Sequence, residues 1–494
     1  MGAILLRADG NAHIGVGHLM RCRALAEAAS VQGIRASIAS ADDRTDVPVL
    51  RVNAASGTDK DAKATIGLAR QCESSWIVVD GYQFGAGYQR ALKDAGLSVL
   101  VMDDGGHSEH YSADVIVNAN VHAHDDFYRS REPYTKLLLG TRYVFMRQEF
   151  LEFRRQRKAR GSVKRVLVTL GGGDAPNATL AVLLALSKIT KMDFEVVVAI
   201  GPENPHRESL EAFAAESALD VKLESGLNQM ARLMAESDIA IAGAGSTSWE
   251  LAYMGVPQLA VVIAENQRPV AEELERLGVV MRLGDTRDLK GEATAKKIAE
   301  VFGDDGIREQ MRLRGTALVD GLGVRRVLAE MGLGEFSLRR ARPDDCEHLY
   351  EWNNQADVRA VSFSTDPIPY ESHRKWFAAK LSDPACRIYI ALDRQGARMG
   401  QVRYEISGNE AEVAIVVDSR YRGKQYGALM IERATQIVRA EGAIEIVHAY
   451  IRGDNEKSSG AFRAAGFVDA GKVSIKGCEA AHYLYEKQNI TAGI

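Results

Sequence analysis

The stretch RADGNAHIGVGHLMRCRALAEAAS, residues 7–30, decides the fold of the first half of the chain. The apolar run AILL comes just before it and predicts a buried β-strand. A glycine-rich turn follows, and apolar residues then recur from Cys22 to Ala29 at the spacing of one helix face. Gly33 is a typical stop signal for that helix. Strand, glycine turn and helix in this order are typical of a parallel sheet with helical crossovers.

His18 stands where this turn enters the helix. Gly15 and Gly17 let the backbone approach a ligand closely, and the helix N-terminus favours an anion. The helix dipole disfavours an imidazolium, which keeps His18 neutral and able to accept a proton. From the residues alone two interpretations stay open. His18 either caps its own helix or acts on a ligand at the carboxyl edge of the sheet.

Length and composition describe an ordinary multidomain α/β chain. The 494 residues suggest about three domains. Apolar residues make up 46% of them, and the net charge of −4 argues against a dedicated nucleic-acid or anionic-membrane binder. No apolar run reaches the roughly 18 residues of a membrane span. The start MGAILLRADG predicts a strand and not a signal peptide, and five widely spaced cysteines predict reduced thiols in a cytoplasm.

The order of apolar runs and turns divides the chain into three expected domains. Residues 1–150 alternate apolar runs such as SWIVVD (75–80) with helical patterns, which predicts a Rossmann-like lobe. Residues 165–333 start again with strand, glycine-rich turn and helix. Residues 336–488 contain successive short strands, which predict an α+β domain with a mostly antiparallel sheet. The expected class is α/β, with two Rossmann-like lobes followed by this α+β domain.

The second lobe contains another glycine-rich turn before a helix, GAGSTSWELAYMG at 243–255. Backbone N–H groups near Ser246 and Thr247 are suited to a diphosphate, and Glu250 one turn later is suited to two ribose hydroxyls. Thr247 and Glu250 also have the spacing of a capping box, an equally good structural interpretation. Asn266 and Gln267 follow the next strand and are expected at the same edge of the sheet.

These motifs carry a family resemblance over about residues 1–330. The second lobe resembles the UDP-sugar-binding half of GT-B glycosyltransferases. The opening stretch resembles, more narrowly, the UDP-sugar hydrolases of pseudaminic-acid biosynthesis. The further motifs behind this resemblance are VVDGYQF (78–84), VMDDGG (101–106), YVFMRQEF (143–150) and LGGGDAPNAT (170–179).

The resemblance implies a hydrolysis in which His18 activates a water that attacks the anomeric carbon, so that UDP leaves. It places UDP against the second lobe. Asp9, Arg21 and Asn177 match positions of the family and are expected near the substrate, although Arg21 also suits a simple pair with a surface carboxylate. Adjacent carboxylates at a strand end point in opposite directions. Asp103 and Asp104 therefore predict no metal site.

A second phosphate-type loop, YRGKQYG at 421–427, stands between a strand and a helix. Together with DNEKSSGAFRAAGF at 454–467 it resembles the GCN5-related N-acetyltransferases (GNAT) over roughly residues 336–488. The resemblance implies acetyl-CoA as co-substrate. The residues that match its binding positions are Val417, Arg422, Gly423, Lys424, Gln425, Tyr426, Gly427, Asn455, Ser458 and Phe462.

Two of these positions depart from the family pattern. Gln425 replaces a usual glycine, and we expect it to adopt a helical φ that still lets its N–H donate. Phe462 replaces a tyrosine that protonates the leaving CoA thiolate, so Tyr450 or Tyr426 is a substitute, or the thiolate leaves unassisted. Glu405 and Glu412 on sheet strands are candidates for the base. Asn455 also suits an ordinary helix N-cap.

Together the two resemblances predict a bifunctional enzyme of nucleotide-sugar metabolism. The C-terminal domain is expected to acetylate a UDP-4-amino-6-deoxy sugar, and the N-terminal lobes to release UDP from the product. Its partners are then a nucleotide sugar and acetyl-CoA, without nucleic acid or membrane. Two alternatives remain, a GT-B glycosyltransferase fused to a GNAT domain and a non-catalytic UDP-sugar-binding module fused to an acetyltransferase.

Overall fold

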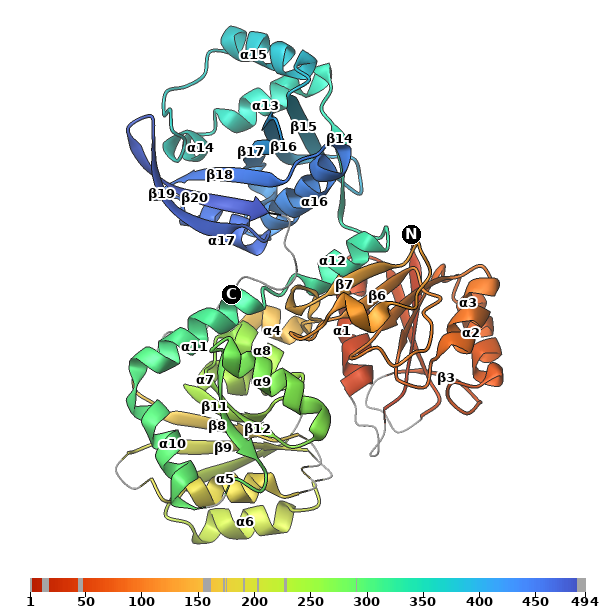
Figure 1. Cartoon of the computed structure of the whole chain (residues 1–494), viewed down its shortest axis with the longest axis vertical. Helices are drawn as coiled ribbons and strands as arrows, with labels where there is room; N and C mark the ends of the chain where they lie inside the picture. Colours follow the sequence, from red (N-terminus) through yellow and green to blue (C-terminus); the bar gives the residue numbers. More distant parts are fainter. Residues whose placement is uncertain are drawn as a thin grey trace. The chain divides into compact units, whose positions relative to one another are not determined.

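The computed structural model divides into two compact units, Met1–Leu333 and Gly334–Ile494 (Figure 1). Each unit is described by itself below. The residues that the structure describes are 2–10, 17–42, 48–153, 161–171, 174, 176–189, 192–201, 204–225, 229–289 and 291–486.

The first lobe of unit 1 is built on a seven-stranded parallel sheet with the order β3-β2-β1-β4-β5-β6-β7. The order reverses between β1 and β4, and ligands of open α/β sheets bind at such a switch point. Its strands are β1 (Ala3–Ala8), β2 (Arg35–Ser40), β3 (Leu50–Arg51), β4 (Trp76–Asp80), β5 (Ser98–Met102), β6 (Val115–Asn118) and β7 (Lys136–Leu139). Its helices are α1 (Gly17–Val31), α2 (Asp59–Gln71) and α3 (Ala86–Asp94).

The opening stretch folds as its apolar pattern predicts. All six residues of β1 are buried, because helices cover both faces of a parallel sheet. Cys22, Leu25 and Ala29 are buried on the inner face of α1. Gly33 ends the helix with a φ of +72°, a left-handed conformation that glycine adopts without strain.

The second lobe repeats the arrangement with six parallel strands in the order β10-β9-β8-β11-β12-β13. Its switch point lies between β8 and β11. The strands are β8 (Arg165–Thr169), β9 (Glu195–Ile200), β10 (Asp220–Ser225), β11 (Ile239–Gly243), β12 (Gln258–Val262) and β13 (Val280–Asp285). The helices are α4 (Gln148–Phe153), α5 (Ala178–Leu186), α6 (Arg207–Glu216), α7 (Met230–Glu236), α8 (Thr247–Met254), α9 (Arg268–Arg276), α10 (Glu292–Gly303) and α11 (Asp305–Leu318).

A helix from the end of unit 1 returns to the first lobe. Helix α12 (Gly323–Glu330) follows the second lobe in sequence, yet Val327 and Leu328 are buried in the same apolar cluster as Leu6 and Leu25. This helix therefore ties the two lobes into one unit (Figure 1).

Unit 2 contains one mixed sheet with the order β14-β15-β16-β17-β18-β20-β19. All neighbouring pairs are antiparallel except β17 and β18, in agreement with the mostly antiparallel sheet that the sequence predicts. The strands are β14 (Phe336–Arg340), β15 (Cys386–Asp393), β16 (Arg398–Ser407), β17 (Glu410–Val417), β18 (Ile446–Arg452), β19 (Val468–Ile475) and β20 (Cys478–Glu486). The helices are α13 (Cys346–Asn353), α14 (Ala356–Ala360), α15 (Tyr370–Ser382), α16 (Tyr426–Glu441) and α17 (Glu456–Ala464).

The two parallel strands of unit 2 separate after a short contact. Their ladder joins Glu410–Glu412 to Ile446–His448, whereas β17 continues to Val417 and β18 to Arg452. We call this opening the fork. Beyond the fork, β17 and β18 no longer pair with each other, so the backbone N–H and C=O groups on their facing edges need other hydrogen-bond partners.

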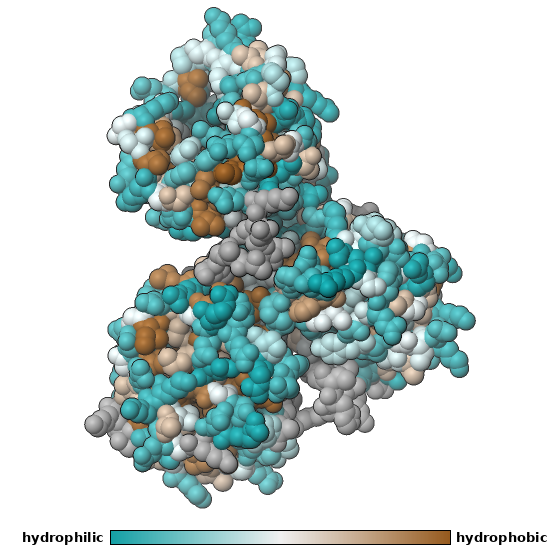
Figure 2. Space-filling view, in the orientation of Figure 1, coloured by the Kyte–Doolittle hydropathy of each residue, from teal (hydrophilic) through white to brown (hydrophobic). Residues whose placement is uncertain are grey.

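The surface of each unit is largely polar on the face that Figure 2 draws, with apolar residues in small separate patches. Among the described helices, none combines the length and the apolar character that crossing a lipid bilayer requires.

The return of α12 depends on a close backbone approach at Gly323. A Cβ added there would lie 2.2 Å from the carbonyl oxygen of Val144. We expect Gly323→Ala to lower the free energy of unfolding of unit 1 by about 2 kcal/mol, because backbone atoms must shift to admit the methyl group. Thermal denaturation followed by circular dichroism measures this loss. Gly67→Ala is the matched control. It lies inside α2 with open space around it, and we expect it to stabilise the unit by about 0.5 kcal/mol.

Candidate functional site

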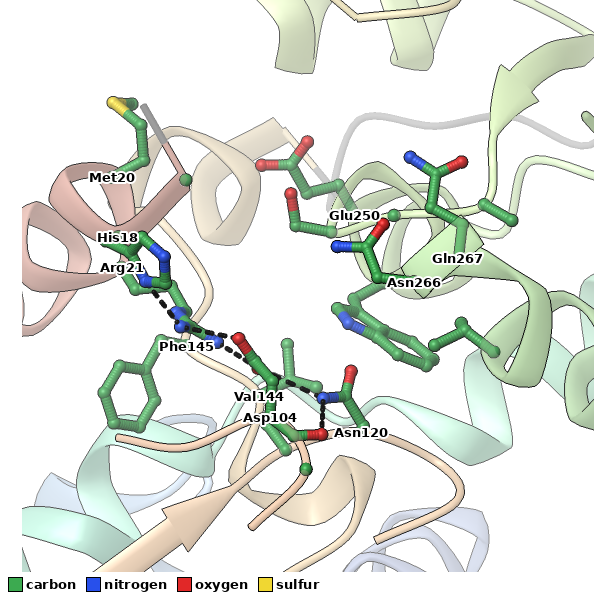
Figure 3. Close-up of a pocket in the computed structure, with 18 of the residues that line it drawn as sticks. His18, Met20, Arg21, Asp104, Asn120, Val144, Phe145, Glu250, Asn266 and Gln267 are labelled. Carbon is green, nitrogen blue, oxygen red and sulfur yellow. Dashed lines mark hydrogen bonds and ion pairs between the residues drawn. The ribbon is translucent and has the colours of Figure 1, made fainter. Parts of the chain in front are cut away.

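A cavity of about 540 Å³ opens between the two lobes of unit 1 (Figure 3). In Figure 3, His18 and Arg21 lie on one wall, whereas Glu250, Asn266 and Gln267 lie on the opposite wall. The described lining residues are Gly17, His18, Met20, Arg21, Tyr82, Asp104, Gly105, His107, Ala119, Asn120, His122, Val144, Phe145, Arg147, Ala244, Gly245, Ser246, Trp249, Glu250, Asn266, Gln267 and Val270.

His18 is held by a buried carboxylate. It lies in the first turn of α1, and its Nδ1 is 2.6 Å from Oδ1 of Asp80, the last residue of β4. The Asp80 side chain is fully buried, whereas 13% of the His18 side chain is exposed. An ionised carboxylate only accepts hydrogen bonds, so we assign the Nδ1 proton to this contact. Nε2 of the neutral ring then carries the lone pair that accepts a proton.

Arg21, one turn further along α1, binds the same carboxylate of Asp80. Its Nε lies 3.0 Å from Oδ2 of Asp80, and its Nη1 lies 2.5 Å from Oδ1 of Asp104. Asn120 Nδ2 donates to Asp104 as well, at 3.1 Å. Burial opposes the ionisation of Asp104, but Arg21 outweighs it and holds the pKa of that carboxyl below its ordinary value. The interpretation of Arg21 as the partner of a surface carboxylate is wrong, because it bridges two carboxylates beside the cavity.

Glu250 faces the cavity from α8 and is paired with Arg147. Nε and Nη2 of Arg147 lie 3.2 and 2.9 Å from Oε1 of Glu250. Burial raises the pKa of Glu250 above its ordinary value, and Arg147 only partly offsets this effect. The capping-box interpretation is wrong. The N-cap of α8 is Ser246, which makes no side-chain cap hydrogen bond, and Thr247 is the first helical residue.

Three residues predicted for this site are absent from the described lining of the cavity. Asp9 is buried beside Arg7, 2.6 Å from Nη1, and it accepts hydrogen bonds from Ser40 and Ser56. It is therefore part of a structural network under the sheet edge. Asn177 precedes α5 in a left-handed conformation and, like Thr247, is absent from the described cavity lining. Gly15 lies outside the described residues.

The sequence interpretation missed several polar residues that line the cavity, namely Tyr82, Asp104, His107, Asn120 and Arg147, and also Asp80, which contacts His18 from below the surface. The signal was available for three of them. Asp80 ends β4, Asp104 follows β5 and Asn120 follows β6. Carboxyl ends of neighbouring parallel strands meet at one edge of the sheet, which is where the cavity lies.

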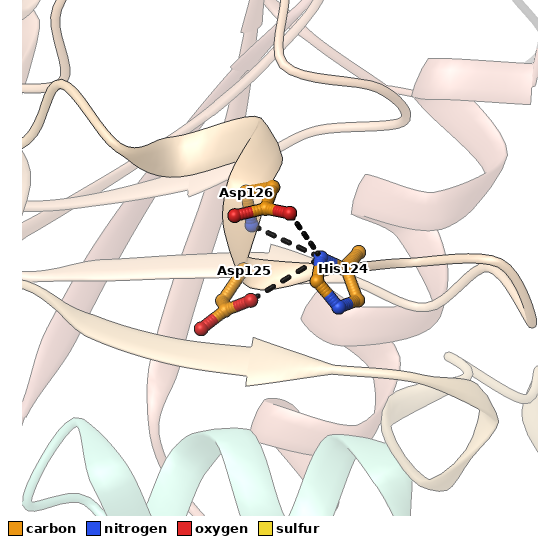
Figure 4. Close-up of side chains that lie close together, drawn as sticks. All are labelled: His124, Asp125 and Asp126. Atoms are coloured by element: carbon orange, nitrogen blue, oxygen red, sulfur yellow. Dashed lines mark hydrogen bonds and ion pairs between the residues drawn. The ribbon is translucent and has the colours of Figure 1, made fainter. Parts of the chain in front are cut away.

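Two clusters that contain acidic residues are candidates for a metal site. Asp103 and Asp104 diverge as predicted, since Asp103 accepts from the N–H groups of Gly105 and Gly106 while Asp104 meets Arg21. In the described parts of the chain, His124, Asp125 and Asp126 form one group whose ligand atoms lie within 4.8 Å of one another (Figure 4). Arg129 Nη2 pairs with Asp126 at 2.7 Å. We assign no metal to either group.

In unit 2 the predicted phosphate loop lies between β17 and α16. Gln425 has a φ of +61° and a ψ of 10°, so the expectation of a helical φ is wrong and the residue is left-handed. This explains why glycine suits the position. Gly427 lies in the first turn of α16, where a Cβ would be 3.7 Å from Val417 and 3.8 Å from Ala461. Arg422 donates to the carbonyl of Val417 at 2.7 Å and also contacts Gln355 and Asp357. Gly423 has a φ of +75°.

Some of the remaining predicted residues of unit 2 make structural contacts, whereas others lie at the fork. Asn455 caps α17 by accepting from the N–H of Ser458, as an ordinary N-cap does. Phe462 is buried against Phe467 in the core. Glu405 is paired with Lys380 at 2.7 Å. Tyr426 packs against the core edge, whereas Tyr450 and Glu412 lie at the fork.

Comparison with known proteins identifies two domain types in this chain. Residues 165–313 match the glycosyltransferase family 28 C-terminal domain, and residues 335–468 match the acetyltransferase (GNAT) domain. The chain thus contains one segment similar to each of these two domain types. The GNAT match supports acetyl-CoA as the co-substrate of unit 2.

Three relatives show how far the likeness extends. An uncharacterized protein of Methanocaldococcus jannaschii is 20% identical over 98% of this chain and 99% of its own length. The spore coat polysaccharide biosynthesis protein SpsG of Bacillus subtilis is 27% identical over 47% of this chain and 68% of its own. The pseudaminic acid cytidylyltransferase and UDP-2,4-diacetamido-2,4,6-trideoxy-beta-L-altropyranose hydrolase of Helicobacter pylori is 25% identical over 47% of this chain and 43% of its own.

The left-handed conformation of Gln425 predicts a stabilising substitution. A side chain with positive φ costs of the order of 1 kcal/mol, which glycine avoids. We expect Gln425→Gly to raise the free energy of unfolding of unit 2 by about 1 kcal/mol without weakening acetyl-CoA binding. Chemical denaturation and calorimetric titration measure the two quantities. The matched control is Gly423→Ala, which places a Cβ at a φ of +75° and should destabilise the unit. Equal stability of the three proteins would contradict the prediction.

Proposed function

We propose that the chain is a bifunctional nucleotide-sugar enzyme. Unit 2 transfers the acetyl group of acetyl-CoA to the amine of a UDP-4-amino-6-deoxy sugar. Unit 1 hydrolyses the resulting UDP-2,4-diacetamido-2,4,6-trideoxy-β-L-altrose to UDP and the free sugar. The single observation that carries the hydrolysis is the His18–Asp80 pair at 2.6 Å, in which the buried Asp80 holds a histidine that faces the cavity from the wall opposite Glu250.

The geometry of this pair suits a base that activates water. Asp80 fixes the ring of His18 and the tautomer that leaves Nε2 unprotonated. Water attacks the anomeric carbon while Nε2 takes its proton, a new C–O bond forms, and the bond from carbon to the UDP oxygen breaks. Arg21 holds Asp80 in place and balances its charge.

The opposite wall suits the nucleotide. The turn at Gly245 and Ser246 leads into the N-terminus of α8, where backbone N–H groups and the helix dipole favour a diphosphate. Glu250 follows one turn later and offers a carboxylate to ribose hydroxyls. Asn266 and Gln267 line the same wall after β12. With the nucleotide bound by the second lobe, the first lobe can act on the sugar.

One relative supports the hydrolase part of the proposal, and another shares the length of both units. The hydrolase named for Helicobacter pylori and the spore coat polysaccharide protein both match about half of this chain, and the Methanocaldococcus protein is similar over both units. An acetyltransferase fused to a UDP-sugar hydrolase has a direct chemical reason, because the first reaction makes the substrate of the second.

The role of His18 predicts a loss of turnover without a loss of binding. We expect His18→Gln to lower the rate of UDP release by about a hundredfold or more, since general-base catalysis contributes that much. UDP affinity, measured by calorimetric titration, should stay unchanged because the nucleotide contacts lie on the other wall. His124→Gln, an exposed histidine of the same lobe, is the matched control and should release UDP at the wild-type rate. Near-normal turnover of His18→Gln would show that His18 is not the base.

The bifunctional proposal predicts a product that needs both units. Supplied with UDP-4-amino-4,6-dideoxy-β-L-AltNAc and acetyl-CoA, the wild-type chain should yield CoA, UDP and the free 2,4-diacetamido sugar, detected by mass spectrometry. His18→Gln should stop at the acetylated UDP-sugar. UDP release that depends on an added acceptor would indicate a glycosyltransferase instead, and UDP binding without any turnover would indicate a binding module.

A further inference from the structure

Three aromatic rings stack on one face of the sheet in unit 2. The ring of Tyr450 lies 4.7 Å from that of His482 at an angle of 19°, and His448 is parallel to Tyr450 at 6.2 Å. Val447 and Ala449 are buried in the core that packs against α16. Because side chains alternate along a strand, His448 and Tyr450 point to the other face.

Hydrogen bonds join two of these rings to a carboxylate. His448 Nδ1 lies 3.0 Å from His482 Nε2, and His448 Nε2 lies 3.2 Å from Oε2 of Glu410. The carboxylate requires a proton on Nε2 of His448, so neutral His448 accepts from His482 through Nδ1. Among the described residues, Nδ1 of His482 has no hydrogen-bond partner. His482, His448 and Glu410 thus form a hydrogen-bonded chain that we call the line. It begins at the lone pair on Nδ1 of His482 and ends at the carboxylate of Glu410.

This line begins beside the fork. His448 is the last residue of β18 that pairs with β17, opposite Glu412, and Tyr450 is the next residue on the same face beyond it. His482 pairs with Tyr450 across β18 and β20. The gap of the fork therefore has the stacked rings where the strands separate and, at the far end of β17, the turn at Gly427, whose Cβ would lie 3.7 Å from Val417. A thioester that enters the gap from the α16 end would reach the rings with its carbonyl carbon.

The surroundings shift the pKa values of His482 and Tyr450 in opposite directions. Burial and then the neighbouring His448 lower the pKa of His482 below its ordinary value, although Asp469 opposes them. Burial, Glu412 and Glu410 raise the pKa of Tyr450 above its ordinary value. Near neutral pH His482 is thus unprotonated and Tyr450 retains its proton. Groups whose surroundings push their pKa values apart are suited to act as base and acid.

Two further charged groups near the rings have partners of opposite charge. Arg452, the next residue on this face of β18, pairs with Asp454 and donates to the carbonyl of Ser362 at 3.2 Å. Glu405, opposite Glu412 on β16, pairs with Lys380. Of the two carboxylates named above as candidate bases, Glu405 is thus paired with a lysine, whereas Glu412 lies opposite His448 and raises the pKa of Tyr450.

We propose that His482 is the base and Tyr450 the acid of the acetyl transfer, with His448 and Glu410 as positioning residues. This inference rests on the proposed acetyltransferase function. It assigns the acid role, which Phe462 cannot fill, to a tyrosine on another strand.

The proton and bond changes balance within this cluster. The amine nitrogen forms a bond to the carbonyl carbon of acetyl-CoA, and the C–S bond breaks. The proton of the attacking nitrogen passes to Nδ1 of His482, while the Nε2 proton of His482 shifts to Nδ1 of His448, whose positive charge then faces Glu410. The Tyr450 hydroxyl protonates the CoA thiolate, and exchange with solvent restores the starting protonation. The products are the acetamido sugar and CoA.

The test measures thiol release from acetyl-CoA with UDP-4-amino-4,6-dideoxy-β-L-AltNAc across a range of pH, using the full chain. For the wild type we expect kcat to fall as the pH drops through the lowered pKa of His482, because only its neutral form accepts a proton. We expect His482→Gln to lower kcat about a hundredfold with unchanged acetyl-CoA affinity. Tyr450→Phe should also lower kcat. His348→Gln, a histidine on α13 of the same unit, should behave as the wild type.

His448→Gln provides the readout that a purely structural role would not move. The substitution removes one of the two causes that lower the pKa of His482 and leaves its burial in place, so the acid limb of the profile should shift to higher pH. A His482→Gln protein that stays within threefold of the wild type, with the same profile, would overturn this inference alone. A wild-type chain that releases no thiol with the amino sugar would instead overturn the proposed function of unit 2.

Discussion

The contact between His18 and Asp80 is the interaction on which the first unit is organised. Asp80 is fully buried at the end of β4 and receives His18 and Arg21 from one face of α1. A buried carboxylate is costly unless charged or hydrogen-bonding groups surround it, so the three side chains depend on one another. Arg21 extends the network to Asp104 at the end of the next strand. Strand order, helix position and side-chain chemistry are thereby coupled at a single edge of the sheet.

The two lobes of unit 1 share one topology but carry different chemistry at their switch points. In the first lobe the turn after β1 leads to an imidazole supported by carboxylates. In the second lobe the turn after β11 leads to a helix N-terminus with Glu250 paired to Arg147. Arg147 lies between the lobes in sequence and lines the cavity, and α12 returns to the first lobe. These connections keep the two walls of the cavity within one unit.

Unit 2 illustrates how a site tolerates departures from a family pattern. Gln425 takes up the left-handed conformation in place of the usual glycine, so the backbone path is kept at a cost in strain. Phe462 fills the core, and the polar groups lie instead on the open face of β18 and β20. The fork between β17 and β18 brings that face beside the turn of α16.

By itself, the sequence determined the local elements and their order. Apolar spacing from Cys22 to Ala29 defined a helix face, and glycine turns marked the edges where His18 and Ser246 lie, because these patterns depend only on neighbours along the chain. The tertiary structure decided which of these edges meet. Asp80 reaches His18 because β4 lies beside β1, and His482 reaches His448 because β20 lies beside β18. Such pairings depend on strand order, which arises from packing over the whole sheet and leaves no local trace in the sequence.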